Sequence, residues 1–248
     1  MKIKLNHYII GLYVLGIVSI LSACKKSDSA SPSSNTQLAF ALSASGNVTP
    51  VTSAVSNGVQ TTNAAGSASI SWTAGTANVS AFKLEAKKKG LEIEITSRNL
   101  TSIDLFAATP TTISAAIDTG TYREIELRVL FAKTSGSAIP LTLKGNYTST
   151  TGTVTPIEFD FNDDAVIKVE AENVTVDGST DFAALAKFDV SKLIGSGLAG
   201  ALDAATRTNG TIIISSSSNT NIYNAIKSRI TDCGKWGGFE HHDKSGRK

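Results

Sequence analysis

Apolar and polar residues alternate along much of the chain between positions 37 and 176. Residues 82–87 and residues 91–95 place apolar side chains at every second position, with Lys and Glu between them. The same period of two runs through residues 125–131 and residues 157–161. Because successive side chains of a strand point to opposite faces of a sheet, this period predicts half-buried β-strands.

Turn residues separate these predicted strands. Residues 87–90 read Lys-Lys-Lys-Gly, which fits a hairpin turn because Gly90 can adopt a positive φ while the lysines face water. A lysine-rich binding patch is the alternative interpretation of the same residues. Many short strands with Gly, Asn, Ser and Thr between them predict a mainly β chain. We expect residues 37–176 to form an antiparallel β-sandwich of transthyretin-like or immunoglobulin-like architecture.

The apolar period changes after Gly178. Apolar positions recur at helical spacing between residues 193 and 205, although three glycines interrupt them. Residues 211–214 predict one returning strand. Ser218 or Asn219 then caps a second predicted helix, in which isoleucines recur every four residues. We therefore expect a small helical extension that packs on the sandwich.

The N-terminus has the features of a secretory signal. Lys2 and Lys4 precede an apolar run at residues 8–20, which ends in Leu-Ser-Ala before Cys24. This ending resembles the bacterial lipobox, in which cleavage falls between the residues equivalent to Ala23 and Cys24 and the cysteine thiol takes a diacylglyceryl group. Acyl chains anchor a domain because each buried methylene contributes about 0.8 kcal/mol. A permanent transmembrane helix is the alternative, but the run is shorter than the roughly 20 residues that span a bilayer.

These patterns divide the chain into five segments. The residues that follow Cys24 are rich in Ser and lack large apolar side chains, which is typical of a flexible tether. The predicted segments are a signal peptide (1–23), a lipidated tether (24–36), a β-sandwich domain (37–176), a helical C-terminal extension (177–232) and a mobile tail (233–248).

Charge and cysteine content narrow the choice of partners. The chain has 23 basic and 21 acidic residues, and loss of Lys2 and Lys4 with the signal makes the mature chain formally neutral. Nucleic acid is therefore not an expected partner, because binding to phosphates needs a basic excess. Lipidation of Cys24 leaves Cys233 without an intramolecular mate, either as a free thiol or in an intermolecular bridge.

Two short segments gather side chains that bind metals. Asp160, Asn162, Asp163 and Asp164 offer oxygen ligands of the kind that Ca²⁺ prefers, but the glycine and terminal glutamate of an EF-hand are absent. The other interpretation is a strand end that enters a turn, where Asn and Asp accept bonds from backbone amides. The second segment, in the tail, is formed by Glu240, His241, His242 and Asp243, for which adventitious metal binding is the favoured interpretation.

Catalytic chemistry has little support in the sequence. A Ser-His-Asp hydrolase needs an imidazole, and the mature chain has histidines only in its tail. Paired carboxylates, which glycosidases use, occur at Glu92 with Glu94 and at Glu124 with Glu126, where solvated strand faces explain them more simply. Trp72 alternates with apolar residues and is expected in the core. No catalytic residue and no cofactor is predicted.

Several short motifs resemble Bacteroidota surface lipoproteins of unknown function. They are the lipobox and tether, the region around Trp72, residues 100–105, the Gly-Thr-Tyr strand entry within residues 117–128, and the acidic-aromatic strand at residues 157–161. The resemblance covers residues 37–176 and implies a β-sandwich without a family catalytic residue. The triplet Asp-Ser-Ala around Ser29 also resembles an O-glycosylation acceptor of that bacterial group.

The combined pattern favours a non-enzymatic protein of the cell envelope, anchored by lipid in the outer membrane. Its sandwich would bind an envelope protein or a glycan, and Trp236 is the more exposed candidate for stacking on a sugar. The alternatives are a lipid-anchored, carboxylate-dependent glycan hydrolase and a structural subunit of a surface assembly whose sheet edges accept a strand. Nothing in the sequence identifies a ligand.

Overall fold

A computed structural model describes residues 37–52, 67–176 and 180–243 of the chain. These residues all fall within one compact unit, Ser31–Lys248. The signal peptide, the tether, the cleavage site at Ala23 and Cys24, and the glycosylation candidate Ser29 lie outside the described residues. Within the described ranges, no helix has both the length and the apolar character needed to cross a membrane.

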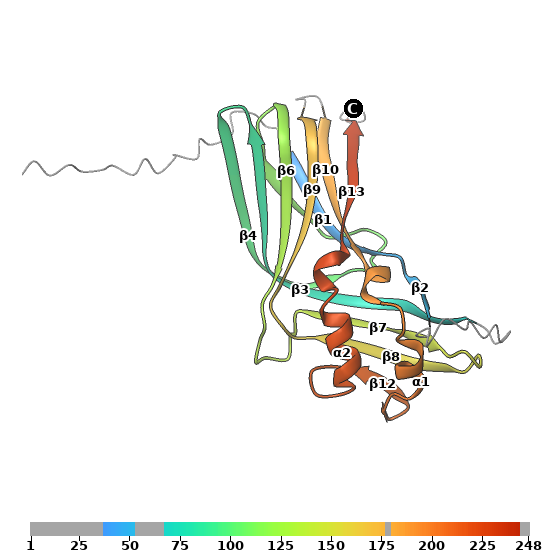
Figure 1. Cartoon of the computed structure of the whole chain (residues 1–248). Helices are drawn as coiled ribbons and strands as arrows, with labels where there is room; N and C mark the ends of the chain where they lie inside the picture. Colours follow the sequence, from blue (N-terminus) through green and yellow to red (C-terminus); the bar gives the residue numbers. More distant parts are fainter. Residues whose placement is uncertain (1–36, 53–66, 177–179, 244–248) are drawn as a thin grey trace, which may run out of the picture. The chain divides into compact units, whose positions relative to one another are not determined.

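The described elements are mostly strands, and they form two sheets (Figure 1). This confirms the prediction of a mainly β chain. The four-stranded sheet has the order β13-β10-β1-β5, with bounds Gly234–Asp243, Thr180–Asp189, Gln37–Ser45 and Thr112–Ala116. The nine-stranded sheet has the order β11-β12-β8-β7-β3-β6-β9, with bounds Arg207–Thr208, Thr211–Ile214, Val154–Phe161, Leu141–Thr148, Ala68–Lys88, Gly120–Phe131 and Ala165–Val176. Its remaining strands, β2 (Val48–Val51) and β4 (Leu91–Asp104), also pair with β3.

Strand β3 connects two regions of the larger sheet. Its first part pairs with β2 and β7, and its second part pairs with β4 and β6. A register shift between Trp72 and Ala74 interrupts the pairing with β7, and another between Ala77 and Val79 interrupts the pairing with β4. β3 and β4 form the predicted hairpin, in which Gly90 has a φ of +76°. The alternating pattern therefore located the second half of this long strand correctly.

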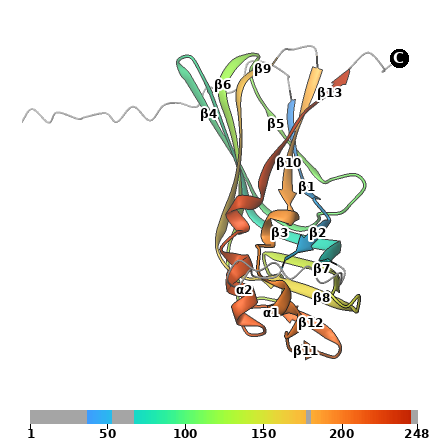
Figure 2. The ribbon, with the colours of Figure 1, turned by 45° about the vertical axis from the view of Figure 1, so that its right-hand side comes forward.

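Alternation buries one face of the paired strands against the smaller sheet. On β6, Ile125, Leu127 and Val129 are buried, and on β9 the buried positions include Ile167 and Val169. The smaller sheet stands beside these strands in Figure 2. Each fully buried side chain of this size contributes about 1.5–3 kcal/mol, so this apolar layer between the sheets is the main source of stability.

The predicted boundary at residue 176 does not separate two structural units. Strand β1 pairs in parallel with β10, which comes from the expected helical extension, and β8 pairs in parallel with β12 from the same segment. These two parallel pairs differ from the expected all-antiparallel pairing. The physical reason is that β10 and β12 return after long connections and so enter the sheets in the same direction as their partners.

The C-terminal segment contains short helices as well as strands. They are a 3₁₀ turn η1 (Val190–Leu193), helix α1 (Ala199–Asp203), helix α2 (Thr220–Lys227) and a 3₁₀ turn η2 (Ile230–Cys233). Strand β12 and helix α2 match the predicted elements, and Ile222 and Ile226 are buried as the spacing predicts. Asn219 does not cap α2 through its side chain, which bonds to backbone groups of Thr206 and Ile213 instead.

The stretch expected to be a mobile tail contains strand β13. It pairs antiparallel with β10 over most of its length. The glycines near its start gave no strand pattern in the sequence. Gly234, its first residue, is required by packing, because a Cβ there would lie 2.3 Å from the backbone oxygen of Lys168 on β9.

Candidate functional site

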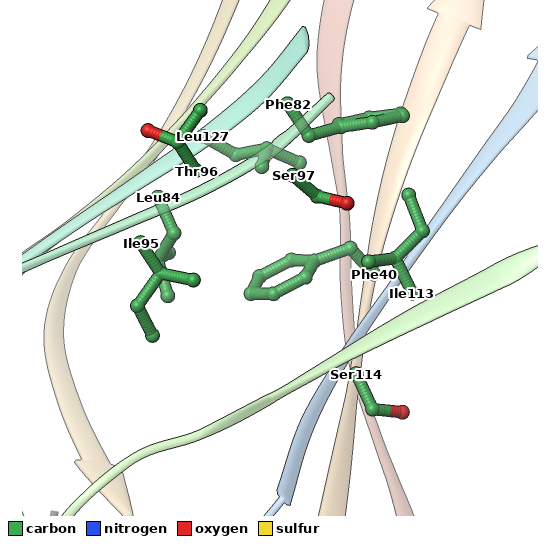
Figure 3. Close-up of a pocket in the computed structure, with 9 residues that line it drawn as sticks. All are labelled: Phe40, Phe82, Leu84, Ile95, Thr96, Ser97, Ile113, Ser114 and Leu127. Atoms are coloured by element: carbon green, nitrogen blue, oxygen red, sulfur yellow. The ribbon is translucent and has the colours of Figure 1, made fainter. Parts of the chain in front are cut away.

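A cavity of about 220 Å³ lies between the two sheets (Figure 3). Strands β1 and β5 of the smaller sheet line one side, and strands β3, β4 and β6 of the larger sheet line the other. Its lining residues are Phe40, Phe82, Leu84, Ile95, Thr96, Ser97, Ile113, Ser114 and Leu127. The site is therefore assembled from segments that are far apart in the sequence.

Burial distinguishes the floor of the cavity from its mouth. Phe40, Phe82 and Leu127 are 3%, 3% and 0% exposed and form an apolar floor. Thr96 and Ser114, on the edge strands β4 and β5, are exposed; they follow the inward-facing Ile95 and Ile113, so their backbones border the mouth while their side chains alternate to the outer faces. A ligand that enters between β4 and β5 would thus pass the edge-strand backbones and then meet the Ser97 hydroxyl and the hydrocarbon floor.

Ser97 gives the cavity its half-buried polar group. It follows Ile93 and Ile95 at the alternating positions of β4, where an apolar residue would continue the pattern. Figure 3 shows its hydroxyl directed toward the side of the cavity where Phe40 and Phe82 lie. Within the described part of the chain, this hydroxyl makes no hydrogen bond. Since polar groups in partly buried sites are normally bonded to a partner or to water, Ser97 can bond to a ligand.

The strands at the mouth are sheet edges. Among the described elements, β4 pairs only with β3, and β5 pairs only with β1. Each therefore leaves backbone donors and acceptors on one side, which is the feature that allows a sheet to accept an additional strand. The cavity opens between these two edges.

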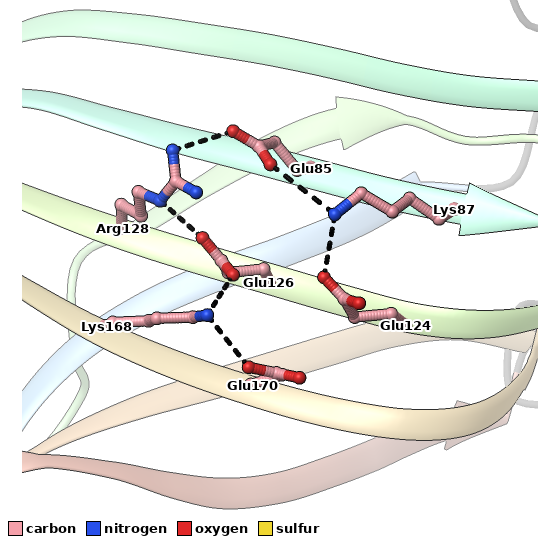
Figure 4. Close-up of polar contacts among 7 residues, drawn as sticks. All are labelled: Glu85, Lys87, Glu124, Glu126, Arg128, Lys168 and Glu170. Carbon is pink, nitrogen blue, oxygen red and sulfur yellow. Dashed lines mark hydrogen bonds and ion pairs between the residues drawn. The ribbon is translucent and has the colours of Figure 1, made fainter.

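The outward face of β3, β6 and β9 carries a network of ion pairs (Figure 4). Arg128 lies 2.8 Å from Glu85, and Lys87 lies 2.9 Å from Glu124. Glu126 forms ion pairs with both Arg128 and Lys168. Lys168 also contacts Glu170 at 2.9 Å, so the network spans three strands. Its charges lie on the face that points away from the cavity.

The paired carboxylates of the glycan-hydrolase alternative belong partly to this network. A hydrogen bond from Lys87 lowers the pKa of Glu124, and bonds to Glu126 and Glu170 raise the pKa of Lys168. A general acid needs the opposite shift, a raised carboxyl pKa. Glu92 and Glu94 are both exposed on the edge strand β4. Glu92 and Glu94 therefore fit the predicted solvated strand face, and Glu124 is half-buried in an ion pair. Glu126 is only 2% exposed beside Arg128 and Lys168, so for this residue the prediction of a solvated position was wrong.

The four residues of the calcium candidate contact different partners. Thr142 donates to Asp160, and the Tyr223 hydroxyl and Lys227 donate to Asp163. The backbone amides of Thr134 and Lys133 donate to Asn162 and Asp164, respectively. This arrangement fits the interpretation as a strand end that enters a turn. Among the described residues, no group of three His, Cys, Asp or Glu is arranged to hold a metal ion.

Asp160 shows one feature that the sequence did not indicate. Burial raises its pKa above the usual range, and the charge of Glu158 two residues earlier adds to this shift. Glu158 itself is paired with Lys144 at 3.2 Å. Asp160 is thus a carboxyl group that holds its proton more tightly than an ordinary aspartate. It lies on β8 and is not one of the residues that line the inter-sheet cavity.

For the candidate metal site in the tail, the structure describes only the position of the backbone. Glu240, His241, His242 and Asp243 lie in β13, opposite residues 180–183 of β10. Their side chains, and that of Trp236, fall outside the described part of the structure. Trp72 is 1% exposed and belongs to the core, as its alternation predicts.

Cys233 is a buried free thiol. Its Sγ lies 3.4 Å from the carbonyl oxygen of Arg229, and burial raises its pKa to about 12. A thiol that is protonated and shielded from solvent is a poor nucleophile. Of the two alternatives from the sequence, the geometry fits the free thiol better than an intermolecular bridge.

Comparison of this chain with protein-family models, with curated proteins and with solved structures finds no match. The sequence had not singled out the cavity residues. Its available signals were the serine at an inward position of β4 and the alternation of Leu38, Phe40 and Leu42 at the start of the domain. Neither signal shows that the two strands face each other.

Proposed function

We propose that this protein is a non-enzymatic lipoprotein of the cell envelope, anchored in the outer membrane through lipid on Cys24, whose two-sheet domain is a binding module. The lipobox-like ending of the signal supports the anchor. The cavity between the sheets supports the binding role, because it combines a buried apolar floor, the half-buried hydroxyl of Ser97 and an opening to solvent. The finer fold type that we propose is a β-sandwich of the transthyretin or immunoglobulin kind.

A small apolar probe tests the binding role. The mature chain, residues 24–248 with Cys24→Ser, is titrated by calorimetry with toluene, a hydrocarbon small enough for a cavity of about 220 Å³. We expect saturable binding that Ser97→Leu, which places a larger side chain at the cavity, weakens at least tenfold. Thr175→Ala, on the exposed face of β9, should bind as the parent does. Equal binding by the parent and Ser97→Leu would place the probe elsewhere and remove the support for this site.

Acyl labelling tests the anchor. Cells that express the whole chain are supplied with labelled palmitate, and the membrane fraction is separated. Cys24→Ser should lose both the label and the membrane association, whereas Cys233→Ala, which removes the other cysteine, should keep both. Label retained by Cys24→Ser would contradict lipidation at this residue.

A role as a structural subunit of a surface assembly is the second candidate. The observation in its favour is that β4 and β5 are edge strands on either side of an apolar cavity. A strand from a neighbouring copy would add backbone hydrogen bonds and place apolar side chains between the sheets. Sedimentation of the mature chain over a range of concentrations separates the two candidates: polymers favour the subunit, and a monomer favours the binding module.

A further inference from the structure

We propose that the inter-sheet cavity binds a small uncharged molecule with an apolar body and one hydrogen-bonding end, such as a medium-chain alcohol, with the polar end at Ser97. This inference rests on the proposed binding function and adds the chemical class of the ligand. Three features support it: the volume of the cavity, the absence of charge in its lining, and the position of its half-buried hydroxyl.

The volume limits the ligand to a small molecule. An apolar cavity of about 150 Å³ binds benzene, which has six heavy atoms, whereas sites for drug-sized ligands begin at about 300 Å³. The cavity here measures about 220 Å³. Scaling by volume gives a ligand of about nine heavy atoms. An eight-carbon alcohol meets this limit.

The lining favours a ligand without charge. None of the nine lining residues is ionisable, and the floor consists of aromatic and aliphatic side chains. A carboxylate placed there would lose its hydration without gaining a cation, which is costly. The lysines and the arginine of the ion-pair network lie on the opposite face of β3, β6 and β9 and are paired with glutamates. They are therefore not placed to compensate a charged ligand.

Ser97 sets the orientation of the ligand. Its hydroxyl can donate to or accept from an alcohol, and it lies between the buried floor and the exposed mouth at Thr96 and Ser114. The hydrocarbon part would then contact Phe40 and Phe82. A net hydrogen bond between neutral groups contributes about 0.5–1.5 kcal/mol, which corresponds to about a two- to thirteenfold change in affinity.

The test compares octan-1-ol with octanoate, which has the same chain length and a charged end. The mature chain with Cys24→Ser is titrated with each at neutral pH, by calorimetry alone and by calorimetry in competition with toluene. We expect octan-1-ol to bind at least tenfold more tightly than octanoate. Ser97→Ala should weaken alcohol binding about three- to tenfold, and Thr175→Ala should leave it unchanged.

The outcomes separate this inference from the proposed function. If octanoate binds as tightly as octan-1-ol, or Ser97→Ala has no effect, the uncharged ligand with its end at Ser97 is overturned while the binding module stands. If toluene binds and Ser97→Leu weakens its binding, but octan-1-ol does not compete with it, the ligand class is likewise overturned. If neither toluene nor either octyl compound binds, the proposed function fails as well. The comparison of the two octyl compounds needs no variant, so it does not depend on the folding of a mutant.

Discussion

Glu126 has an unusual position for an acidic residue. It lies on the outward face of β6, yet its side chain is only 2% exposed, because Arg128 and Lys168 cover it and form ion pairs with it. The two cations are 36% and 50% exposed and remain partly hydrated. The Glu126 carboxylate is therefore buried, while the charged groups of Arg128 and Lys168 stay in contact with water.

This position leads to a prediction about stability. Replacement of a carboxylate that is buried beside two cations leaves these cations without their shared partner, whereas an exposed pair contributes little. We expect Glu126→Gln to lower the free energy of unfolding by about 1–3 kcal/mol. Glu170→Gln, which removes an exposed member of the same network, should lower it by less than about 0.5 kcal/mol. Urea unfolding measures both, and equal losses would show that burial of Glu126 is unimportant.

At the scale of elements, close backbone approach determines how β7 pairs with β3. Gly145 on β7 lies opposite Trp72, next to a register shift of β3. A Cβ at this position would lie 2.1 Å from the carbonyl oxygen of Ser71, which is backbone and cannot rotate away. The glycine is thus required by packing, since its φ is not in the positive range.

We predict that Gly145→Ala separates β7 from β3 and lowers the free energy of unfolding by about 2–4 kcal/mol, the range of severe overpacking. Gly200 in helix α1 provides the matched control, because a Cβ there meets nothing within 4 Å. Gly200→Ala should raise stability by about 0.5–1 kcal/mol through helix propensity. Thermal and urea unfolding of the two variants would show opposite signs; a neutral Gly145→Ala would contradict the packing argument.

Asp163, in the turn after β8, links this turn to helix α2 through hydrogen bonds. Lys227 and Tyr223, both on α2, donate to its carboxylate at 2.6 and 3.0 Å. The bond from Lys227 is the largest cause that lowers the pKa of Asp163 below its ordinary value of 3.8. Because the folded protein binds this proton less readily than the unfolded chain, the pair stabilises the fold above pH 3.8 and the contribution is lost as pH falls through the lower, folded pKa.

The predicted result is a difference in melting temperature that depends on pH. Asp163→Asn should melt below the parent at pH 6, and the gap should narrow as the pH falls below about 4. The contribution should be less than about 1 kcal/mol, since Lys227 is partly exposed. Lys227→Met should reproduce the pattern by removing the main cause of the shift. If the difference in melting temperature between Asp163→Asn and the parent stays constant from pH 6 to below about pH 4, the Asp163–Lys227 pair is not the cause of the stabilisation.

At the scale of the whole molecule, local pattern predicted the strands better than their arrangement. The alternation in β6 and β9 and the hairpin at Gly90 depend on neighbouring residues, so the sequence displays them directly. Strand β10 was missed because its Ala-rich sequence has no alternation of apolar and charged residues. The cavity was missed because it depends on which strands face each other, and Ser97 and Phe40 are brought together only by tertiary packing.

The parallel pairing of β1 with β10 makes the N-terminal and C-terminal parts of the chain interdependent. Strand β1 pairs with β5 on one side and β10 on the other, and β12 extends the larger sheet beside β8. Without the residues after 176, β1 and β8 lose these partners. The core also loses Phe188, Ile212 and Ile214, each at most 1% exposed.

We therefore predict that a fragment of residues 37–176 does not fold cooperatively, whereas residues 37–243 do. The three lost side chains alone supply about 5–9 kcal/mol of burial, which is comparable to the total stability of about 5–15 kcal/mol that domains have. Urea unfolding distinguishes them when it is followed by the fluorescence of Trp72, which both chains contain and the structure buries, in a longer chain that carries Trp236→Phe. A sharp unfolding transition in the shorter fragment would mean that the predicted sandwich is an independent domain and that β10 and β12 only extend it.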